Sequence, residues 1–178
     1  FGKEIISHYV YCLCGDGDLQ EGISYEAASL AGHHKLHNLI VIYDSNNITI
    51  EGNTNVSMSE DICKRFEAQG WQVLNCDGHN ILAFHNALTR AKDSTKPTLI
   101  IAKTIIAKNA LDLEGSHKAH GAPLGEEIIA KAKAKLGLEA QSFYVPDDVK
   151  FTFGLMRERG ELAFKQWHKQ YENLPQIT

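Results

Sequence analysis

The sequence has few cysteines, little net charge and no long apolar run. None of its 178 residues lies in a stretch approaching the ~20 apolar residues that a membrane span requires. A net charge of -4 argues against nucleic acid as the main partner. The four cysteines, Cys12, Cys14, Cys63 and Cys76, form no CxxC pair and are too few for a disulfide framework. We therefore expect a cytoplasmic protein with reduced thiols, bound neither to a membrane nor to nucleic acid.

The loops that mark common nucleotide-binding proteins are also missing, since the chain has neither a GxGxxG loop nor a P-loop. Its length allows one domain with a sizeable core, and 43% hydrophobic with 22% charged residues is ordinary for a globular protein. The chain starts at Phe1 and enters an apparent buried strand within a dozen residues. We therefore expect that the first part of this domain is absent.

Short apolar runs predict the strands. Three continuous runs, with a weaker fourth, lie at 9–14, 39–43, 98–102 and 72–76. Continuous runs of this length are typical of strands that are covered on both faces. Helices are expected between and after them, at 22–35, 57–69, 81–92, 125–136 and 155–171. This alternation predicts an α/β fold: a parallel sheet with helices on both faces.

Two local signals refine the expected helices and domains. Ser57 and Glu60 have the spacing of a capping box and predict the start of the second helix. Gly160 is expected to interrupt the last helix. Around Pro146 the compact domain is expected to end. This divides the chain into a domain at 1–148 and a helical tail or linker at 149–178.

Polar clusters follow two of the predicted strands. Gly15-Asp16-Gly17 ends the first strand, and Asp44-Ser45-Asn46-Asn47 ends the second. One helix and one strand lie between the clusters, which is enough for one βαβ crossover. Because ligands of open α/β sheets bind at the carboxyl ends of the strands, we expect Asp16 and Asn46 to lie side by side at that edge.

The chemistry of these residues suits a diphosphate held through a divalent metal. A carboxylate and an amide oxygen are hard ligands of the kind that Mg²⁺ or Ca²⁺ prefers. Gly17 lacks a Cβ, so its N–H can approach a phosphate closely at the start of the next helix, whose dipole favours an anion. Both clusters are also ordinary turn chemistry, and a nucleotide-binding α/β domain remains a second interpretation.

The two clusters resemble a known fingerprint. Gly15-Asp16-Gly17, followed about thirty residues later by Asn46-Asn47, resembles the motif of thiamine-diphosphate enzymes. Within that group, four segments look like transketolase: 15–32, 48–52, 65–71 and 115–123. The resemblance runs from about residue 9 to residue 148. It implies the thiamine-diphosphate-binding fold, with 1–148 as the diphosphate- and metal-binding domain and 149–178 leading toward an absent pyrimidine-binding domain.

The resemblance implies a ligand set for the metal and the diphosphate. Asp16, the side chain of Asn46 and the backbone carbonyl of Ile48 would hold Mg²⁺ or Ca²⁺. Gly17 and Asn46 would contact the diphosphate of the cofactor, thiamine diphosphate.

The resemblance also implies residues on a later loop. Ile106 would lie against the cofactor, and His120 would face both the diphosphate and the substrate as a catalytic residue. Ala107 and Asn109 stand where glycines are usual in the family. This departure leaves the path of the loop open.

The implied activity is transfer of a two-carbon ketol unit from a ketose phosphate to an aldose phosphate. Glu21 and Glu26 resemble buried glutamates of the family's subunit interface, although a solvated helix face is the alternative. The implied partners are sugar phosphates and a second subunit, either a copy of this chain in a homodimer or a chain with the pyrimidine-binding domain. We expect this chain to be inactive alone. The alternative is a split-subunit or non-catalytic module that binds metal and diphosphate.

Overall fold

The computed structural model describes residues 5–174, and its chain divides into two compact units. One unit is Tyr9–Leu138. The other combines Phe1–His8 with Glu139–Thr178, of which residues 5–8 and 139–174 are described. Both polar clusters predicted to form a site lie in the unit Tyr9–Leu138.

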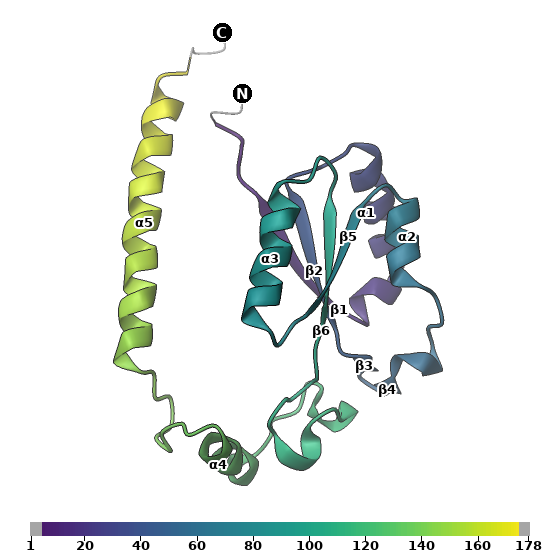
Figure 1. Ribbon diagram of the computed structural model, residues 1–178, viewed down its shortest axis with the longest axis vertical. Coiled ribbons are helices and arrows are strands. Elements are labelled where there is room, and N and C mark those ends of the chain that lie inside the picture. Colours follow the sequence, from purple (N-terminus) through teal and green to yellow (C-terminus); the bar gives the residue numbers. More distant parts are fainter. Residues whose placement is uncertain (1–4, 175–178) are drawn as a thin grey trace. The chain divides into compact units, whose positions relative to one another are not determined.

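A parallel sheet forms the centre of the unit Tyr9–Leu138 (Figure 1). Its four strands are, in spatial order, β1 (Val10–Gly15), β2 (Leu39–Ser45), β6 (Thr98–Lys103) and β5 (Gln72–Asp77). β6 pairs with β2 on one side and β5 on the other, and its first five residues are buried. The parallel α/β sheet predicted from the apolar runs is confirmed. The expectation that the run at 9–14 forms a buried strand is wrong, because β1 is at the end of the strand order and its first four residues are exposed.

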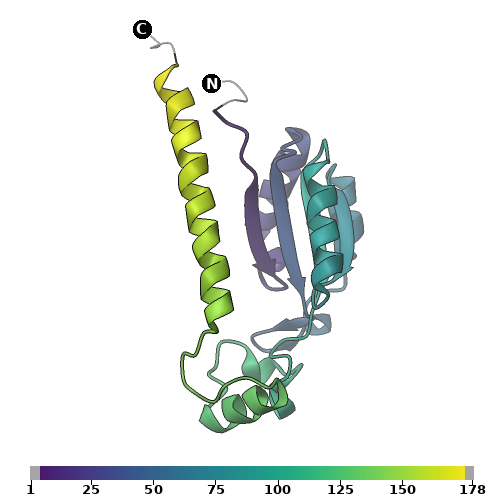
Figure 2. The ribbon, with the colours of Figure 1, turned by 60° about the vertical axis from the view of Figure 1, so that its left-hand side comes forward.

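Helices cover both faces of this sheet (Figures 1 and 2). α1 (Gly22–His33) and α2 (Ile62–Ala68) pack on one face, and α3 (Ile81–Lys92) packs on the other. The two cores separate accordingly, because successive strand residues point to opposite faces. The α1 and α2 face buries Tyr43, Leu99 and Ile101, and the α3 face buries Ile40, Leu74 and Ile100.

One glycine fixes the approach of α1 to the end of α2. A Cβ at Gly32 would lie 1.7 Å from the backbone oxygen of Gln69, so no other residue fits there without a shift of the backbone. Beside this contact, the Trp71 indole N–H donates to the carbonyl of Ala28 at 2.8 Å. The Trp71 ring also meets Phe66 edge to face, with centroids 5.1 Å apart.

The predicted capping box at Ser57 and Glu60 is wrong. α2 begins at Ile62, and the side chain of Asp61 caps it by accepting the backbone N–H of Lys64 at 3.1 Å. The residues of the supposed box have tertiary partners instead. The Ser57 hydroxyl donates to Gln20 at 2.9 Å, and the Glu60 carboxylate accepts from Tyr25 and Arg65.

α3 and α4 match the predictions closely. α3 spans Ile81–Lys92, where the Asn80 side chain accepts the backbone N–H groups of Leu82 and Ala83. α4 is Glu126–Lys135, with acidic residues in its first turn and lysines in its last, as the helix dipole favours.

The second unit contains α5 (Asp147–Glu172), which is longer than predicted. Asp147 and Asp148 occupy its first turn and complement the helix dipole. Gly160 lies inside the helix without ending it, because one glycine costs only about 1 kcal/mol relative to alanine. The Arg157–Glu161 ion pair, 3.1 Å, spans it. Within the same unit, the Trp167 indole N–H donates to the carbonyl of Ile5 at 3.0 Å.

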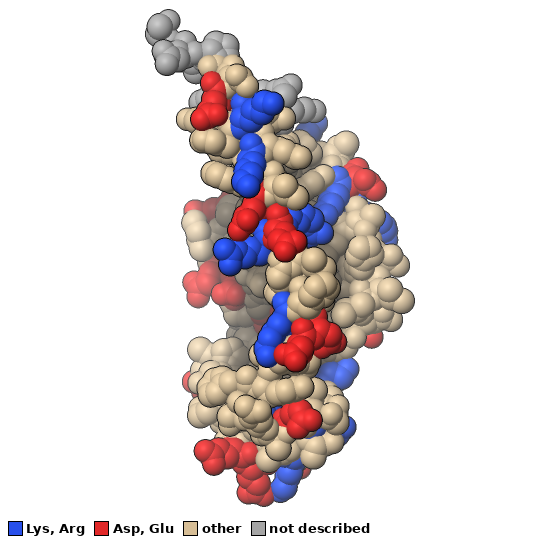
Figure 3. Space-filling view, turned by 90° about the vertical axis from the view of Figure 1, so that its left-hand side faces the viewer, with Lys and Arg blue, Asp and Glu red and all other residues tan. Residues whose placement is uncertain are grey.

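Charged side chains of both signs lie on the surface. Figure 3 shows Lys and Arg intermixed with Asp and Glu on the face it presents, rather than gathered into a patch of one sign.

Among residues 5–174, none of the helices combines the length and the apolar character that a membrane span requires.

Candidate functional site

The two polar clusters meet at the carboxyl edge of the sheet. β1 and β2 run parallel, with Gly15 opposite Asp44, so the residues that follow each strand emerge side by side. The backbone N–H of Asn46 donates to Oδ2 of Asp16 at 3.2 Å. The adjacency expected for Asp16 and Asn46 is therefore observed.

Asp16 is a buried carboxylate, only 2% exposed. The hydroxyl of Tyr43, on β2, donates to its Oδ1 at 2.6 Å. Burial, and then the hydrogen bond to Asp16, raise the pKa of Tyr43 far above its ordinary value, so the phenol keeps its proton and remains a donor. Tyr43 was not among the residues predicted for the site. One feature of the sequence could have identified it: Tyr43 carries a hydroxyl on a predicted buried strand, directly before the Asp44–Asn47 cluster.

A tight hairpin follows Asn46. The side-chain Oδ1 of Asn46 accepts the N–H of Ile48 at 3.0 Å. Asn47 adopts a left-handed φ of 61°, which asparagine tolerates. The short strands β3 (Ile48–Thr49) and β4 (Gly52–Asn53) pair antiparallel. The hairpin was not predicted, because two-residue strands carry no periodic signal.

The position of Gly17 corrects one expectation. It caps a three-residue 3-10 helix, η1 (Asp18–Gln20), and α1 begins only at Gly22. The dipole of a full helix is therefore not placed at Gly17. A Cβ built on Gly17 meets nothing within 4 Å, so the space beside its backbone is open to a ligand.

The segment around η1 is held from both sides. The Asp18 carboxylate accepts the N–H of Gly15 at 2.7 Å, and the guanidinium of Arg65 donates to the carbonyl of Leu19 at 3.2 Å. Leu19 is buried in the core. These contacts hold the backbone on either side of Gly17, at Gly15 and at Leu19.

The loop after β6 resolves the question raised by Ala107 and Asn109. Both residues adopt the left-handed conformation, with φ of 50° and 70°. The loop therefore keeps a path that suits glycine, although neither residue is glycine. It is closed by the N–H of Gly115, which donates to the carbonyl of Ile106 at 2.9 Å.

All six candidate residues line one cavity of roughly 670 Å³. They come from four separate segments: Asp16, Gly17, Asn46, Ile48, Ile106 and His120. His120 directly follows the 3-10 helix η4 (His117–Ala119) and is exposed. Glu21 also lines this cavity.

The donors of the cavity fit a hard cation. Across the described residues, no three His, Cys, Asp or Glu side chains gather in one cluster. The polar groups at 16 and 46 instead offer one carboxylate and one amide oxygen. Oxygen donors of this kind suit Mg²⁺ or Ca²⁺ together with phosphate oxygens, so the residues present fit both a divalent metal and a diphosphate.

The fold and the cavity define a class of protein: a thiamine-diphosphate-binding α/β domain, whose GDG and Asn-Asn clusters meet at one sheet edge. The chain belongs to the transketolase family. A family model described as "Transketolase, thiamine diphosphate binding domain" matches residues 1–177.

Individual relatives agree with the family model. The chain is 47% identical to the transketolase of Geobacillus stearothermophilus over 173 residues, covering 95% of this chain and 26% of that protein. The crystal structure of transketolase from Campylobacter jejuni superposes with a TM-score of 0.94 at 56% identity, covering 97% of this chain and 27% of that one. A Pichia stipitis transketolase in complex with sedoheptulose 7-phosphate gives 0.87 at 39% identity, covering 90% and 24%. The chain thus spans about a quarter of the length of the relatives it matches.

Proposed function

We propose that this chain provides the diphosphate- and metal-binding part of a transketolase, which transfers a two-carbon ketol unit from a ketose phosphate to an aldose phosphate. The observation that carries the proposal is the single cavity that gathers Asp16, Asn46, Ile106 and His120 in a member of this family. The sugar phosphate in the Pichia stipitis relative supports the substrate class.

In this proposal Asp16, the side chain of Asn46 and the carbonyl of Ile48 hold Mg²⁺ or Ca²⁺. Gly17 and Asn46 bind the diphosphate. The carboxylate of Asp16 brings one negative charge, so a divalent ion bound there keeps positive charge for the phosphate oxygens. Tyr43 keeps Asp16 in place through its 2.6 Å hydrogen bond.

The other residues act around the reacting end of the cofactor. Bound thiamine diphosphate supplies a nucleophilic carbon and an electron sink for the cleavage of a carbon–carbon bond. Ile106 packs against it and excludes water, and His120 donates a hydrogen bond toward a substrate oxygen on which charge develops.

The proposal extends to the assembly. We expect a cytoplasmic enzyme with a second subunit, either a copy of this chain or a chain that carries the pyrimidine-binding domain. Glu21 and Glu26 are both exposed in this chain, as residues of an interface without its partner would be. A split-subunit or non-catalytic module that binds metal and diphosphate is the alternative.

Calorimetric titration with thiamine diphosphate and Mg²⁺ tests the site. In the complete enzyme that contains these residues, Asp16→Ala removes the charged metal ligand and should weaken cofactor binding at least a hundredfold, about 2.7 kcal/mol. Asp93→Ala is the matched control, because Asp93 directly follows α3 and does not line the cavity. Unchanged affinity in Asp16→Ala would refute the ligand assignment. Normal binding without ketol transfer in the unmutated enzyme would favour the non-catalytic alternative.

A further inference from the structure

The loop that carries Ile106 is conformationally unfavourable. Three of its residues with a Cβ have left-handed backbones, with φ of 50° at Ala107, 70° at Asn109 and 52° at Leu111. Residues other than glycine rarely adopt this conformation, and it persists where surrounding contacts hold it. The contacts that fix this loop therefore decide where Ile106 lies.

Some of these contacts lie within the loop itself. The N–H of Gly115 donates to the carbonyl of Ile106 at 2.9 Å, and the carboxylate of Glu114 accepts the N–H of Asn109 at 2.9 Å. They close the loop on itself. They do not fix it to the sheet.

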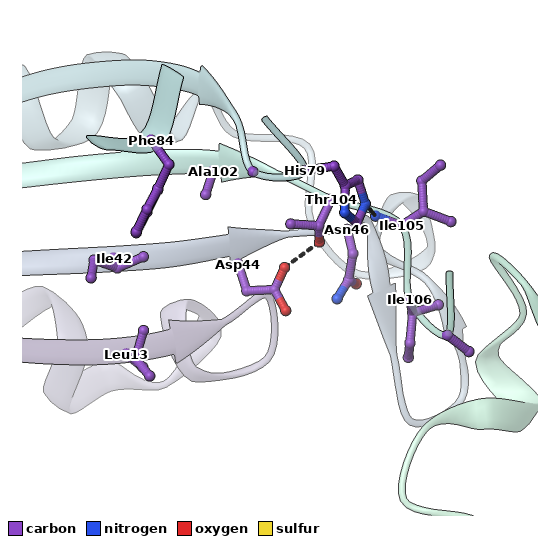
Figure 4. A pocket seen from close by; sticks show the side chains of 12 residues that line it. Leu13, Ile42, Asp44, Asn46, His79, Phe84, Ala102, Thr104, Ile105 and Ile106 are labelled. Carbon is purple, nitrogen blue, oxygen red and sulfur yellow. Dashed lines mark hydrogen bonds between the residues drawn. The ribbon is translucent and has the colours of Figure 1, made fainter. Parts of the chain in front are cut away.

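The anchor to the sheet comes from the end of β5. The imidazole Nε2 of His79 accepts the backbone N–H of Ile105 at 2.9 Å (Figure 4). The backbone N–H of His79 donates to Oδ1 of Asp77 at 2.9 Å. Nε2 acts here through its lone pair, so the ring is an acceptor for the loop. A second contact joins the Thr104 hydroxyl to the Asp44 carboxylate of β2.

The turn before His79 allows this approach. The N–H of Gly78 donates to the carbonyl of Lys103 at 2.8 Å, which extends the pairing of β5 with β6 beyond the strands. A Cβ at Gly78 would lie 2.6 Å from Cγ2 of Thr104. The glycine thus lets the segment 77–79 lie directly against the start of the loop.

We propose that His79 is a positioning residue: by holding the amide of Ile105, it fixes the neighbouring Ile106 in the wall of the cofactor cavity. Ile106 lines that cavity and also the adjoining one of roughly 450 Å³, which His79 itself lines (Figure 4). The role of Ile106 toward the cofactor rests on the proposed function, whereas the hold of His79 on the loop does not.

Two substitutions in the complete enzyme separate the acceptor from the bulk of the side chain. His79→Leu removes the acceptor at similar size, and His79→Gln keeps an acceptor at a comparable reach. His85→Leu is the matched control, since His85 is an exposed histidine on α3. Two quantities are measured: hydrogen exchange of the amides at 104–107, and kcat at saturating thiamine diphosphate and Mg²⁺. Exchange in β2 and β6 shows whether each variant is folded.

His79→Leu should raise exchange at Ile105 and lower kcat, each about tenfold, the size expected for removing one hydrogen bond. For His79→Gln, both the exchange at Ile105 and kcat should stay within about threefold of the unmutated enzyme, a difference below that of one hydrogen bond. The control His85→Leu should behave in the same way as His79→Gln. Unchanged exchange in His79→Leu, or equal damage in His79→Gln, would overturn the proposal. Faster exchange with an unchanged kcat would also overturn it, because Ile106 would then not depend on the anchor. If the unmutated enzyme shows no ketol transfer, the proposed function fails, and exchange alone decides whether His79 holds the loop.

Discussion

At the scale of single residues, the burial of Asp16 carries the strongest physical argument for a cation. A buried charged carboxylate is costly unless it is both hydrogen-bonded and paired with a positive charge. The donors observed on Asp16 are the Tyr43 hydroxyl and the Asn46 amide, and both are neutral. Such an environment orients the carboxylate without neutralising it. A divalent ion in the cavity would supply the missing positive charge.

His120 should affect turnover more than cofactor binding. In the proposed function, His120→Ala in the complete enzyme would remove a donor that faces developing charge, and such donors are typically worth about 10²- to 10³-fold in rate. The proposed metal site and Gly17 would still hold the diphosphate. Steady-state kinetics at saturating cofactor, beside a cofactor titration, separate the two effects. An unchanged kcat with weaker cofactor binding would make His120 a phosphate ligand only, and no change in either would place it outside the site.

The four cysteines carry no disulfide, and Cys14 contributes to the core. Cys12, Cys14, Cys63 and Cys76 are all free thiols. Burial, with smaller effects from nearby acidic groups, raises the pKa of Cys14 to about 12, so it stays a protonated thiol at neutral pH. The thiol of Cys14 therefore packs against the α1 and α2 core as an apolar group.

At the scale of elements, the sequence correctly predicted the helices and strands whose ends and spacing depend on nearby residues. α3 matched because its cap at Asn80 and its apolar spacing agree. α2 did not, because Ser57 and Glu60 bind partners distant in sequence, and no local pattern reveals those contacts. The same division holds in the site. The meeting of Asp16 and Asn46 follows from one crossover. Ile48 begins a strand of only two residues, and Ile106 and His120 lie on loops, so these three were assigned only through the family resemblance.

The loop after β6 offers a stability prediction. Ala107→Gly relieves a left-handed alanine, which costs roughly 1–2 kcal/mol, and adds backbone entropy to the unfolded chain, which costs roughly 0.5–1 kcal/mol. The expected result is a free energy of unfolding equal to the original or up to about 1.5 kcal/mol higher, measured by urea denaturation. Ala107→Val, with a branched side chain at the same φ, should instead destabilise. If the glycine variant were clearly less stable, the positive φ at this residue would be wrong.

At the scale of the whole molecule, the unit Tyr9–Leu138 exposes large apolar side chains. Leu13 on β1 is 77% exposed and Ile23 on α1 is 69% exposed. Scattered apolar residues are common on protein surfaces. Here they coincide with a chain that spans about a quarter of its relatives' length. Surfaces of this kind suit the second subunit that the proposed function includes.

The 178-residue chain alone should show no ketol transfer. The family resemblance places the pyrimidine-binding domain elsewhere, so this chain would hold the diphosphate without the groups that activate the cofactor. An assay of the purified chain with xylulose 5-phosphate, ribose 5-phosphate, thiamine diphosphate and Mg²⁺ measures this. Turnover near about 10 s⁻¹, an ordinary enzyme rate, would contradict the expectation and would place the catalytic groups within these residues.

The strand order has a consequence for how the protein folds. β1 pairs with β2 across one helix, but β2 then pairs with β6, which comes after β5 and α3 in the chain. This central pairing joins Ile40 to Thr98 and needs the closure of a long segment, a step that slows folding. Until it forms, the end of β6 is not held beside β1 and β2, and the loop bearing Ile106 cannot reach the GDG turn. The ability to bind the cofactor should therefore appear late during folding, after β6 has paired with β2.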